Sequence, residues 1–226
     1  SNKTVILINF SEHLAVSSIS ENLGIEETLR NSSETSETLG DHLIFSYSKD
    51  FGFLGTNPFL SPNQAIIKIT MHIPAIYHAN RIQELSENLK FNIMELSGIN
   101  GNLICSYGFL DMFIGPKPKE TLEEFALRAK KIARNVEEME LEISRQYRAK
   151  NRIKFEDLIL KSYGILKHSR ILSYDDFLSG ISKLLWGSYA GVKPLDEKKI
   201  INNLIKRDTK KNCLNSQKAR ASNLQK

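Results

Sequence analysis

The most regular pattern of apolar residues lies in the middle of the chain. From Leu122 to Ile143, seven apolar residues follow one another at alternating steps of three and four positions. They are Leu122, Phe125, Ala129, Ile132, Val136, Met139 and Ile143. This spacing places them on one side of a helix whose other sides are charged. The pattern therefore predicts one long helix over about residues 119–148, which we expect to pack across a sheet.

The residues before this helix have patterns typical of β-strands. Thr4 to Phe10 is an uninterrupted run of mainly β-branched and apolar residues, which predicts a buried strand. Ala65 to Ile73 alternates apolar and polar residues, as a half-buried strand does. Further strands are expected at residues 42–47, 91–96 and 103–109, and a helix at residues 75–90. The polar segment 25–39 leaves two interpretations open, a weak helix or a mobile connection.

The order of these elements predicts an α+β fold, with an antiparallel sheet flanked by helices and a small helical C-terminal region. Strand patterns precede the long helix, and shorter helical patterns follow it at residues 155–166, 174–186 and 195–205. We expect residues 1–150 to form a first domain that ends in the long helix. Residues 151–226 are expected to form the helical C-terminal region with a basic tail.

The net positive charge of the chain comes from this tail. Residues 193–226 contain ten Lys or Arg and three Asp or Glu, a balance of +7, whereas the whole chain has a net charge of +5. The first 192 residues therefore have a balance of −2. This distribution argues against nucleic-acid binding by the protein as a whole. A tail that binds RNA or an acidic partner ranks last among our interpretations.

Cysteine usage and hydropathy narrow the class of protein further. Cys105 and Cys213 have no metal-ligand spacing around them, so we expect neither a zinc site nor a disulfide framework, as in a reducing cytoplasm. The apolar runs are far shorter than the ~20 residues that cross a membrane, so we expect no membrane partner. The chain begins Ser1-Asn2-Lys3 without an initiator Met, and we expect the natural N-terminus to lie upstream.

Few residues form a catalytic constellation by spacing alone. Glu12 and His13 follow a predicted strand and are open to interpretation as an acid and base pair, although polar pairs at strand ends are commonplace. The sequence GINGN at residues 98–102 is open to interpretation as a phosphate loop, but Asn-Gly favours a hairpin turn. Neither GxGxxG nor a P-loop is present.

Three separated segments, taken in order, resemble the guanido (phosphagen) kinase superfamily. They are FGFLGTNP at residues 51–58, MHIPAI at residues 71–76 and KSYGIL at residues 161–166. More narrowly, they resemble its protein-arginine kinase branch over about residues 5–211. The resemblance implies ATP and Mg²⁺ as cofactors, a guanidinium as phosphate acceptor, a protein substrate or partner that includes phosphoarginine proteins, and a homodimer. It also implies that a nucleotide-binding Arg-x-Arg motif lies upstream of residue 1.

The catalytic motif of that superfamily is altered in this chain. The family sequence Asn-Glu-Glu-Asp-His, then any residue and Arg, corresponds to NFSEHLA at residues 9–15. The resemblance implies catalytic roles for Glu12 and His13, in a degenerate motif with Asn9 and Ser11. Both family glutamates and the phosphate-binding arginine are replaced.

Two further sites follow from the resemblance, each with substitutions. The family's Thr-Cys-Pro substrate loop becomes Thr56-Asn57-Pro58. The phosphoarginine pocket of the protein-arginine kinase branch, Arg-Asp-x-x-Arg-Ala, becomes RDTKKN at residues 207–212. Its implied contact residues are Arg207, Asp208 and Lys211. A basic helix end that complements the helix dipole accounts for this tail equally well.

The phosphate-binding segments have lost their arginines. The family's Gly-Leu-Arg-Ala-Ser becomes QAIIK at residues 64–68, so Ile66 replaces an arginine that grips phosphate. Lys68 is a weaker candidate for nucleotide binding, because an ammonium lacks the guanidinium fork. Arg-Gly-x-x-Gly-Glu falls on residues 97–102 and loses both its Arg and its Glu.

These losses predict a pseudokinase that serves as a regulatory or scaffolding protein. A triphosphate held without compensating cations is strongly disfavoured. The alternative is an active, divergent protein-arginine kinase, in which an upstream segment completes the nucleotide site and Glu12 supplies the carboxylate.

Overall fold

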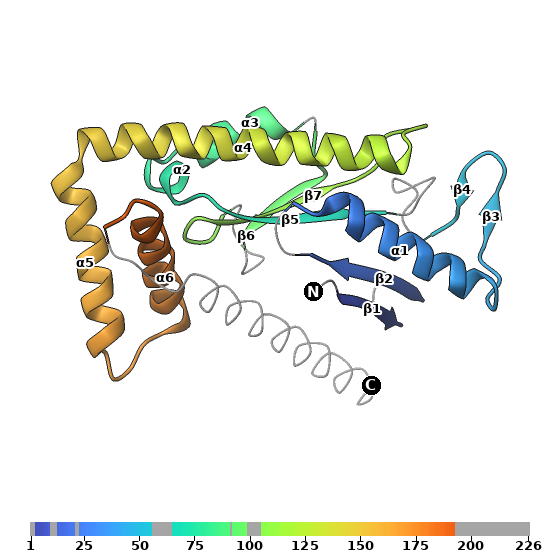
Figure 1. The fold of residues 1–226 in the computed structure, drawn as a ribbon, viewed down its shortest axis with the longest axis horizontal. Coiled ribbons are helices and arrows are strands. Elements are labelled where there is room, and N and C mark those ends of the chain that lie inside the picture. The colour runs from blue at the N-terminus through green and yellow to red at the C-terminus, as the bar shows by residue number, and fades with distance from the viewer. Residues whose placement is uncertain are drawn as a thin grey trace, which may run out of the picture. The chain divides into compact units, whose positions relative to one another are not determined.

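The computed structural model describes residues 3–9, 13–20, 23–55, 65–90, 92–98 and 105–192. The chain divides into two compact units, Ser1–Gln146 and Tyr147–Lys226. The first unit combines antiparallel strands with helices, and the described elements of the second are helical (Figure 1). The predicted α+β class is therefore confirmed.

The centre of the first unit is a three-stranded antiparallel sheet with the strand order β5–β7–β6. Its strands are β5 (Ile67–His72), β6 (Glu95–Gly98) and β7 (Phe109–Ile114). Ile69 pairs with Met112, and Thr70 pairs with Asp111. Because side chains alternate between faces, one face is aliphatic and the other is mainly polar.

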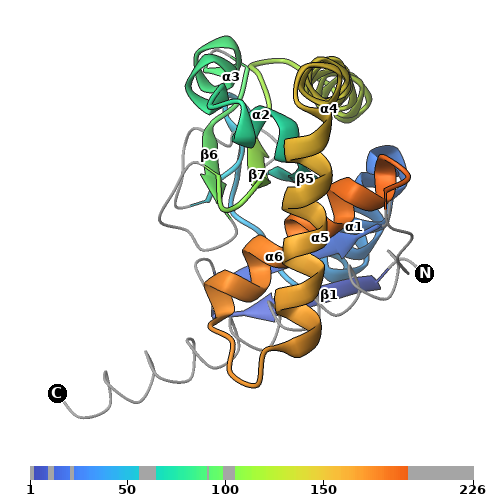
Figure 2. The same cartoon turned by 90° about the vertical axis from the view of Figure 1, so that its left-hand side faces the viewer.

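Three helices lie on the aliphatic side of this sheet: α2 (Pro74–His78), α3 (Ile82–Leu89) and α4 (Leu122–Lys150) (Figures 1 and 2). The apolar stripe of α4 is buried, with Phe125, Ala129 and Val136 at most 1% exposed. Leu110 and Met112 of β7 are fully buried as well. The predicted long helix across a sheet is thus confirmed, because the steps of three and four create one continuous apolar stripe.

Two hairpins and a helix complete the described part of the first unit. Strands β1 (Lys3–Ile8) and β2 (Leu14–Ile19) form an antiparallel pair, and β3 (Tyr47–Ser48) pairs with β4 (Gly52–Phe53). Helix α1 (Ile25–Gly40) packs against β2, and the Ser32 hydroxyl donates to Ser18 Oγ at 2.8 Å. Of the two interpretations left open for residues 25–39, the helix is the one observed.

The expectation that the first strand is buried is wrong. All six residues of β1 are exposed, with Val5 at 45% and Ile8 at 65%. An apolar strand is buried only where other elements cover it, and α1 packs on the neighbouring strand β2. Among the described residues β1 has a strand partner on one edge alone.

Two predicted elements were placed wrongly because the chain turns where they were expected to continue. Residues 42–46 contain no strand, because the amides of His42 and Leu43 donate to Leu39 O and close the end of α1. The helix expected at residues 75–90 is divided into α2 and α3 around Asn80, whose φ of 57° lies in the left-handed region.

The two strands expected at residues 91–96 and 103–109 lie further along the chain, as β6 and β7. Tyr107 and Gly108 form a two-residue turn with φ values of 54° and 88°, and Ser106 and Phe109 exchange backbone hydrogen bonds across it. The turn therefore falls inside the predicted second strand, and β7 begins after it.

The described part of the second unit consists of the end of α4 from Tyr147, then α5 (Arg152–His168) and α6 (Tyr174–Tyr189). The Trp186 ring lies 4.7 Å from Phe155 and 5.3 Å from Tyr147, centroid to centroid. The helices predicted at residues 155–166 and 174–186 are confirmed, and the one at 195–205 lies outside the described residues. In the described ranges, no helix is both long and apolar enough to cross a membrane.

Candidate functional site

The candidate site is the polar face of the three-stranded sheet, opposite the aliphatic face. The register places Glu95, Phe113 and Lys68 in one row across β6, β7 and β5. Ser97, Asp111 and Thr70 form the next row, and Phe109 pairs with His72 beyond them. These residues share a face because they occupy alternate positions of each strand.

A buried carboxylate lies at the centre of this face. Asp111 is 5% exposed, and its Oδ2 lies 2.8 Å from Nζ of Lys68. The Thr70 hydroxyl donates to the other oxygen, Oδ1, at 2.6 Å. The Lys68 ammonium also lies 5.6 Å from the centroid of the Phe113 ring. A buried carboxylate needs such partners, because without them its desolvation would be costly.

These groups do not fit a bound triphosphate. The face holds one cation, Lys68, and two anions, Asp111 and the exposed Glu95. The Lys68 ammonium is directed to Asp111, so little of its charge is available to a phosphate. Ile66, which precedes β5, is 48% exposed and adds no charge. On the described part of the face, ATP would therefore meet a net negative surface.

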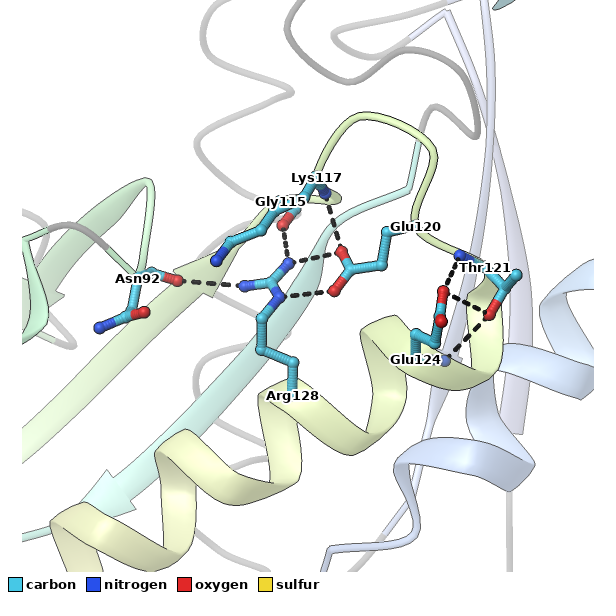
Figure 3. Close-up of polar contacts among 7 residues, drawn as sticks. All are labelled: Asn92, Gly115, Lys117, Glu120, Thr121, Glu124 and Arg128. Atoms are coloured by element: carbon cyan, nitrogen blue, oxygen red, sulfur yellow. Dashed lines mark hydrogen bonds and ion pairs between the residues drawn. The ribbon is translucent and has the colours of Figure 1, made fainter.

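Arg128 is the first arginine after Arg81, and it is fully engaged in local contacts (Figure 3). Its Nε and Nη2 donate to the two oxygens of Glu120 at 2.7 and 2.8 Å. Nη2 also donates to the carbonyl of Gly115 at 2.7 Å, and Nη1 to that of Asn92 at 3.3 Å. Its side chain is 16% exposed. This guanidinium ties α4 to the ends of the sheet and is not free to bind a phosphate.

The carboxylate that holds Arg128 is stabilised in its charged form. The hydrogen bonds from Arg128 hold the pKa of Glu120 below its usual range, and a backbone hydrogen bond from Lys117 acts in the same direction. At the start of α4, Thr121 and Glu124 form a reciprocal capping pair, with backbone-to-side-chain distances of 2.9 and 3.2 Å (Figure 3). The Arg128–Glu120 pair and the Thr121–Glu124 cap are structural, because their polar groups form hydrogen bonds with other groups of the protein.

A half-buried carboxylate, that of Glu140, joins α4 to the corner between β5 and α2. Glu140 Oε1 accepts from the amide of Ala75 at 2.8 Å, and Oε2 accepts from the amide of Ile76 at 2.9 Å. These are the first amides of α2, which have no acceptor within the helix. Burial raises the pKa of Glu140 to about 7, although the two hydrogen bonds act in the opposite direction. The MHIPAI segment at residues 71–76 is therefore held in place by α4.

The described residues contain no activated thiol and no metal cluster. Burial raises the pKa of Cys105 to about 12, and the nearby charge of Glu140 raises it further, so the thiolate is not populated at neutral pH. In the ranges that the structure covers, no three His, Cys, Asp or Glu side chains converge as metal ligands.

The structure places three of the residues proposed from the sequence. Asn9 and His13 meet at the end of the β1–β2 hairpin, where the Asn9 amide donates to the His13 carbonyl at 3.0 Å. Lys68 lies on a separate sheet and is engaged with Asp111. The other candidates lie outside the described residues. They are Ser11, Glu12, Thr56, Asn57, Pro58, Arg207, Asp208 and Lys211.

Sequence reasoning missed the residues that determine the chemistry of the face. Asp111 interrupts the apolar segment FLDMFI, and a lone acid in a buried strand indicates a partnered carboxylate. Glu140 had no comparable signal, because it is one of many glutamates on a long charged helix.

The chain is similar in sequence to known phosphotransferases. The profile of a family described as ATP:guanido phosphotransferase, C-terminal catalytic domain, matches residues 1–109. A protein-arginine kinase of Symbiobacterium thermophilum is 25% identical over 201 residues, which cover 88% of this chain and 57% of the relative. One of Chlamydia pneumoniae is 27% identical over 200 residues, covering 84% and 53%. One of Syntrophomonas wolfei is 24% identical over 201 residues, covering 88% and 56%. The chain thus spans a little over half the length of these relatives.

Proposed function

Because the chain belongs to the guanido kinase superfamily, in its protein-arginine kinase branch, we propose that it is a regulatory or scaffolding relative of these kinases with little or no phosphotransfer activity. The ion pair between Lys68 and Asp111 carries this proposal. In the superfamily, this region grips phosphate with an arginine whose position Ile66 occupies here. The cation that remains on β5 is neutralised within the sheet.

Electrostatics supports the loss of phosphotransfer. Transfer of a phosphoryl group depends on cations that bind the triphosphate and neutralise the charge that develops on it. The polar face contributes one lysine that already has a buried counter-ion, and Arg128 donates its hydrogen bonds to Glu120 and to two carbonyls. The chain's retained segments, such as MHIPAI, serve packing through Glu140.

We propose protein partners for this role, because the matched relatives are named protein-arginine kinases. Proteins that carry phosphoarginine are the first class to test. Arg207, Asp208 and Lys211 are the residues proposed to bind the modified side chain. The absence of a disulfide framework in the sequence favours the cytoplasm as the compartment.

The proposal is tested by incubating the full chain with MgATP and an unfolded arginine-rich protein, with an established protein-arginine kinase as the positive control. Phosphoarginine is then measured by mass spectrometry under conditions that preserve the acid-labile N–P bond. We expect no modified arginine above the level without enzyme. Modification that depends on the chain and on ATP would establish the competing function, an active kinase.

A further inference from the structure

The polar face contains an arrangement that the loss of arginines alone does not explain. A lysine left on an open strand would ordinarily extend into solvent and attract anions. Lys68 is 48% exposed, yet its ammonium lies 2.8 Å from a carboxylate that is 7% exposed. The carboxylate comes from the neighbouring strand, 43 residues further along the chain.

We propose that Asp111 is a specificity-determining residue that closes the polar face to phosphate anions by occupying Lys68 as an internal counter-ion. This inference rests on the proposed function and names the residue that enforces it. Asp111 holds one negative charge where a phosphate oxygen would have to approach the ammonium. A triphosphate that reached Lys68 would therefore meet a fixed, poorly screened like charge within a few ångströms.

Three features keep Asp111 in this position. Thr70 donates a hydrogen bond to Oδ1, which fixes the carboxylate so that Oδ2 is directed at Lys68. The strand register places Thr70 directly opposite Asp111, so the contact follows from the β5–β7 pairing. Burial makes it costly for Asp111 to release its counter-ion, because an unpaired charge would remain in the sheet.

The Lys68–Asp111 pair predicts that removal of the Asp111 charge allows the polar face to bind phosphate anions. In Asp111→Asn, the side-chain oxygen still accepts from Thr70, whereas the amide no longer neutralises Lys68. We expect the variant to bind inorganic tripolyphosphate at least about tenfold more tightly than the wild-type chain in calorimetry at low ionic strength. The double variant Asp111→Asn with Lys68→Met should return to the wild-type affinity, because the gain requires the ammonium.

A matched control separates this pairing from a general change in charge. Glu95→Gln removes the same formal charge from the same face, but Glu95 is exposed on β6, one row away from Asp111. Solvent screens an exposed carboxylate, so we expect its effect on tripolyphosphate affinity to stay within about twofold. Equal gains in Glu95→Gln and Asp111→Asn would overturn the specific role of Asp111.

A measurement on the wild-type chain keeps the inference testable if Asp111→Asn does not fold. The side-chain NMR signal of Lys68 is followed while tripolyphosphate is added, and we expect no saturable shift. A saturable shift would overturn the inference, and so would a folded Asp111→Asn variant with no gain in affinity. The second result leaves the proposed function standing. Phosphoarginine formation by the wild-type chain would instead contradict the proposed function, and the Lys68 signal would then show whether this inference fails with it.

Discussion

The three-stranded sheet and the β1–β2 hairpin are built from similar antiparallel, apolar strands, but their surroundings differ. Leu110, Met112 and Ile114 of β7 are fully buried, whereas Val5, Ile6, Leu7 and Ile8 of β1 are 37–65% exposed. The sheet is covered by α4 (Figure 1), and the hairpin is contacted by α1 mainly at β2. Burial is therefore set by the covering layer, and apolar composition alone does not determine it.

The same two regions differ in how they relate to the superfamily. The hairpin end holds Asn9 and His13, the described residues of the segment in which the sequence predicts a degenerate catalytic motif. The sheet carries the well-matched MHIPAI segment and anchors it through Glu140. The MHIPAI segment is thus held by packing contacts, whereas a catalytic role for the hairpin end stays a prediction. Function depends on such sites more than on the fold.

The largest loss of stability in the sheet region should follow from Arg128→Ala. This change leaves the Glu120 carboxylate without its ion-pair partner at the end of the sheet and frees the carbonyls of Gly115 and Asn92. We expect a loss of about 3–5 kcal/mol in the free energy of unfolding, measured by urea denaturation. Lys131→Ala, an exposed change on the same helix, should stay within about 0.5 kcal/mol. A similar small effect for both would show that the Arg128 contacts do not stabilise the fold.

A pair of equivalent truncations compares the two regions directly. Leu110→Ala creates a cavity at a fully buried position of β7 and should cost about 2–5 kcal/mol of unfolding free energy. Ile8→Ala removes a side chain that is 65% exposed and should cost less than about 1 kcal/mol. Equal losses in chemical denaturation would mean that another layer covers the hairpin in solution.

The Glu140 carboxyl should make the stability of the sheet region depend on pH. Its folded pKa of about 7 lies above its ordinary value of 4.5, so between these values the folded state binds more protons than the unfolded state. The unfolding free energy should therefore fall as pH rises from about 4.5 to about 7, by at most about 3 kcal/mol. Glu140→Gln should remove this slope, and the exposed Glu142→Gln should keep it. Parallel slopes in all three proteins would contradict the assignment. The pKa of Glu120 is lowered, so this group makes the unfolding free energy rise with pH, and it does so only in more acidic solution.

A small effect is expected where polar groups join the hairpin to α1. Ser18 Oγ accepts from Ser32 at 2.8 Å and lies 2.9 Å from the hydroxyl of Thr4. Ser18→Ala should cost about 0.5–1.5 kcal/mol, as expected for partly exposed hydrogen bonds. Thermal unfolding of Ser18→Ala beside Ser33→Ala, a change to a hydroxyl that donates to Glu37 within α1, provides the comparison. A larger loss than for Leu110→Ala would reverse the order of the two regions.

The sequence predicts what depends on local periodicity and misses what depends on distant partners. The apolar stripe from Leu122 to Ile143 predicts α4, because residues three and four positions apart lie on the same face of a helix. The pairing of Lys68 with Asp111 requires the β5–β7 register, which joins strands more than 40 positions apart. The division between α2 and α3 depends on a left-handed Asn80, for which no Gly or Pro gave a signal.

The central claim, that this chain does not hold nucleotide as an active kinase does, is tested most directly by isothermal titration of the full chain with MgATP. The charges on the sheet face predict no saturable heat at submillimolar nucleotide. One-to-one binding with a micromolar dissociation constant would contradict the account, because it would require cations that the described face does not offer.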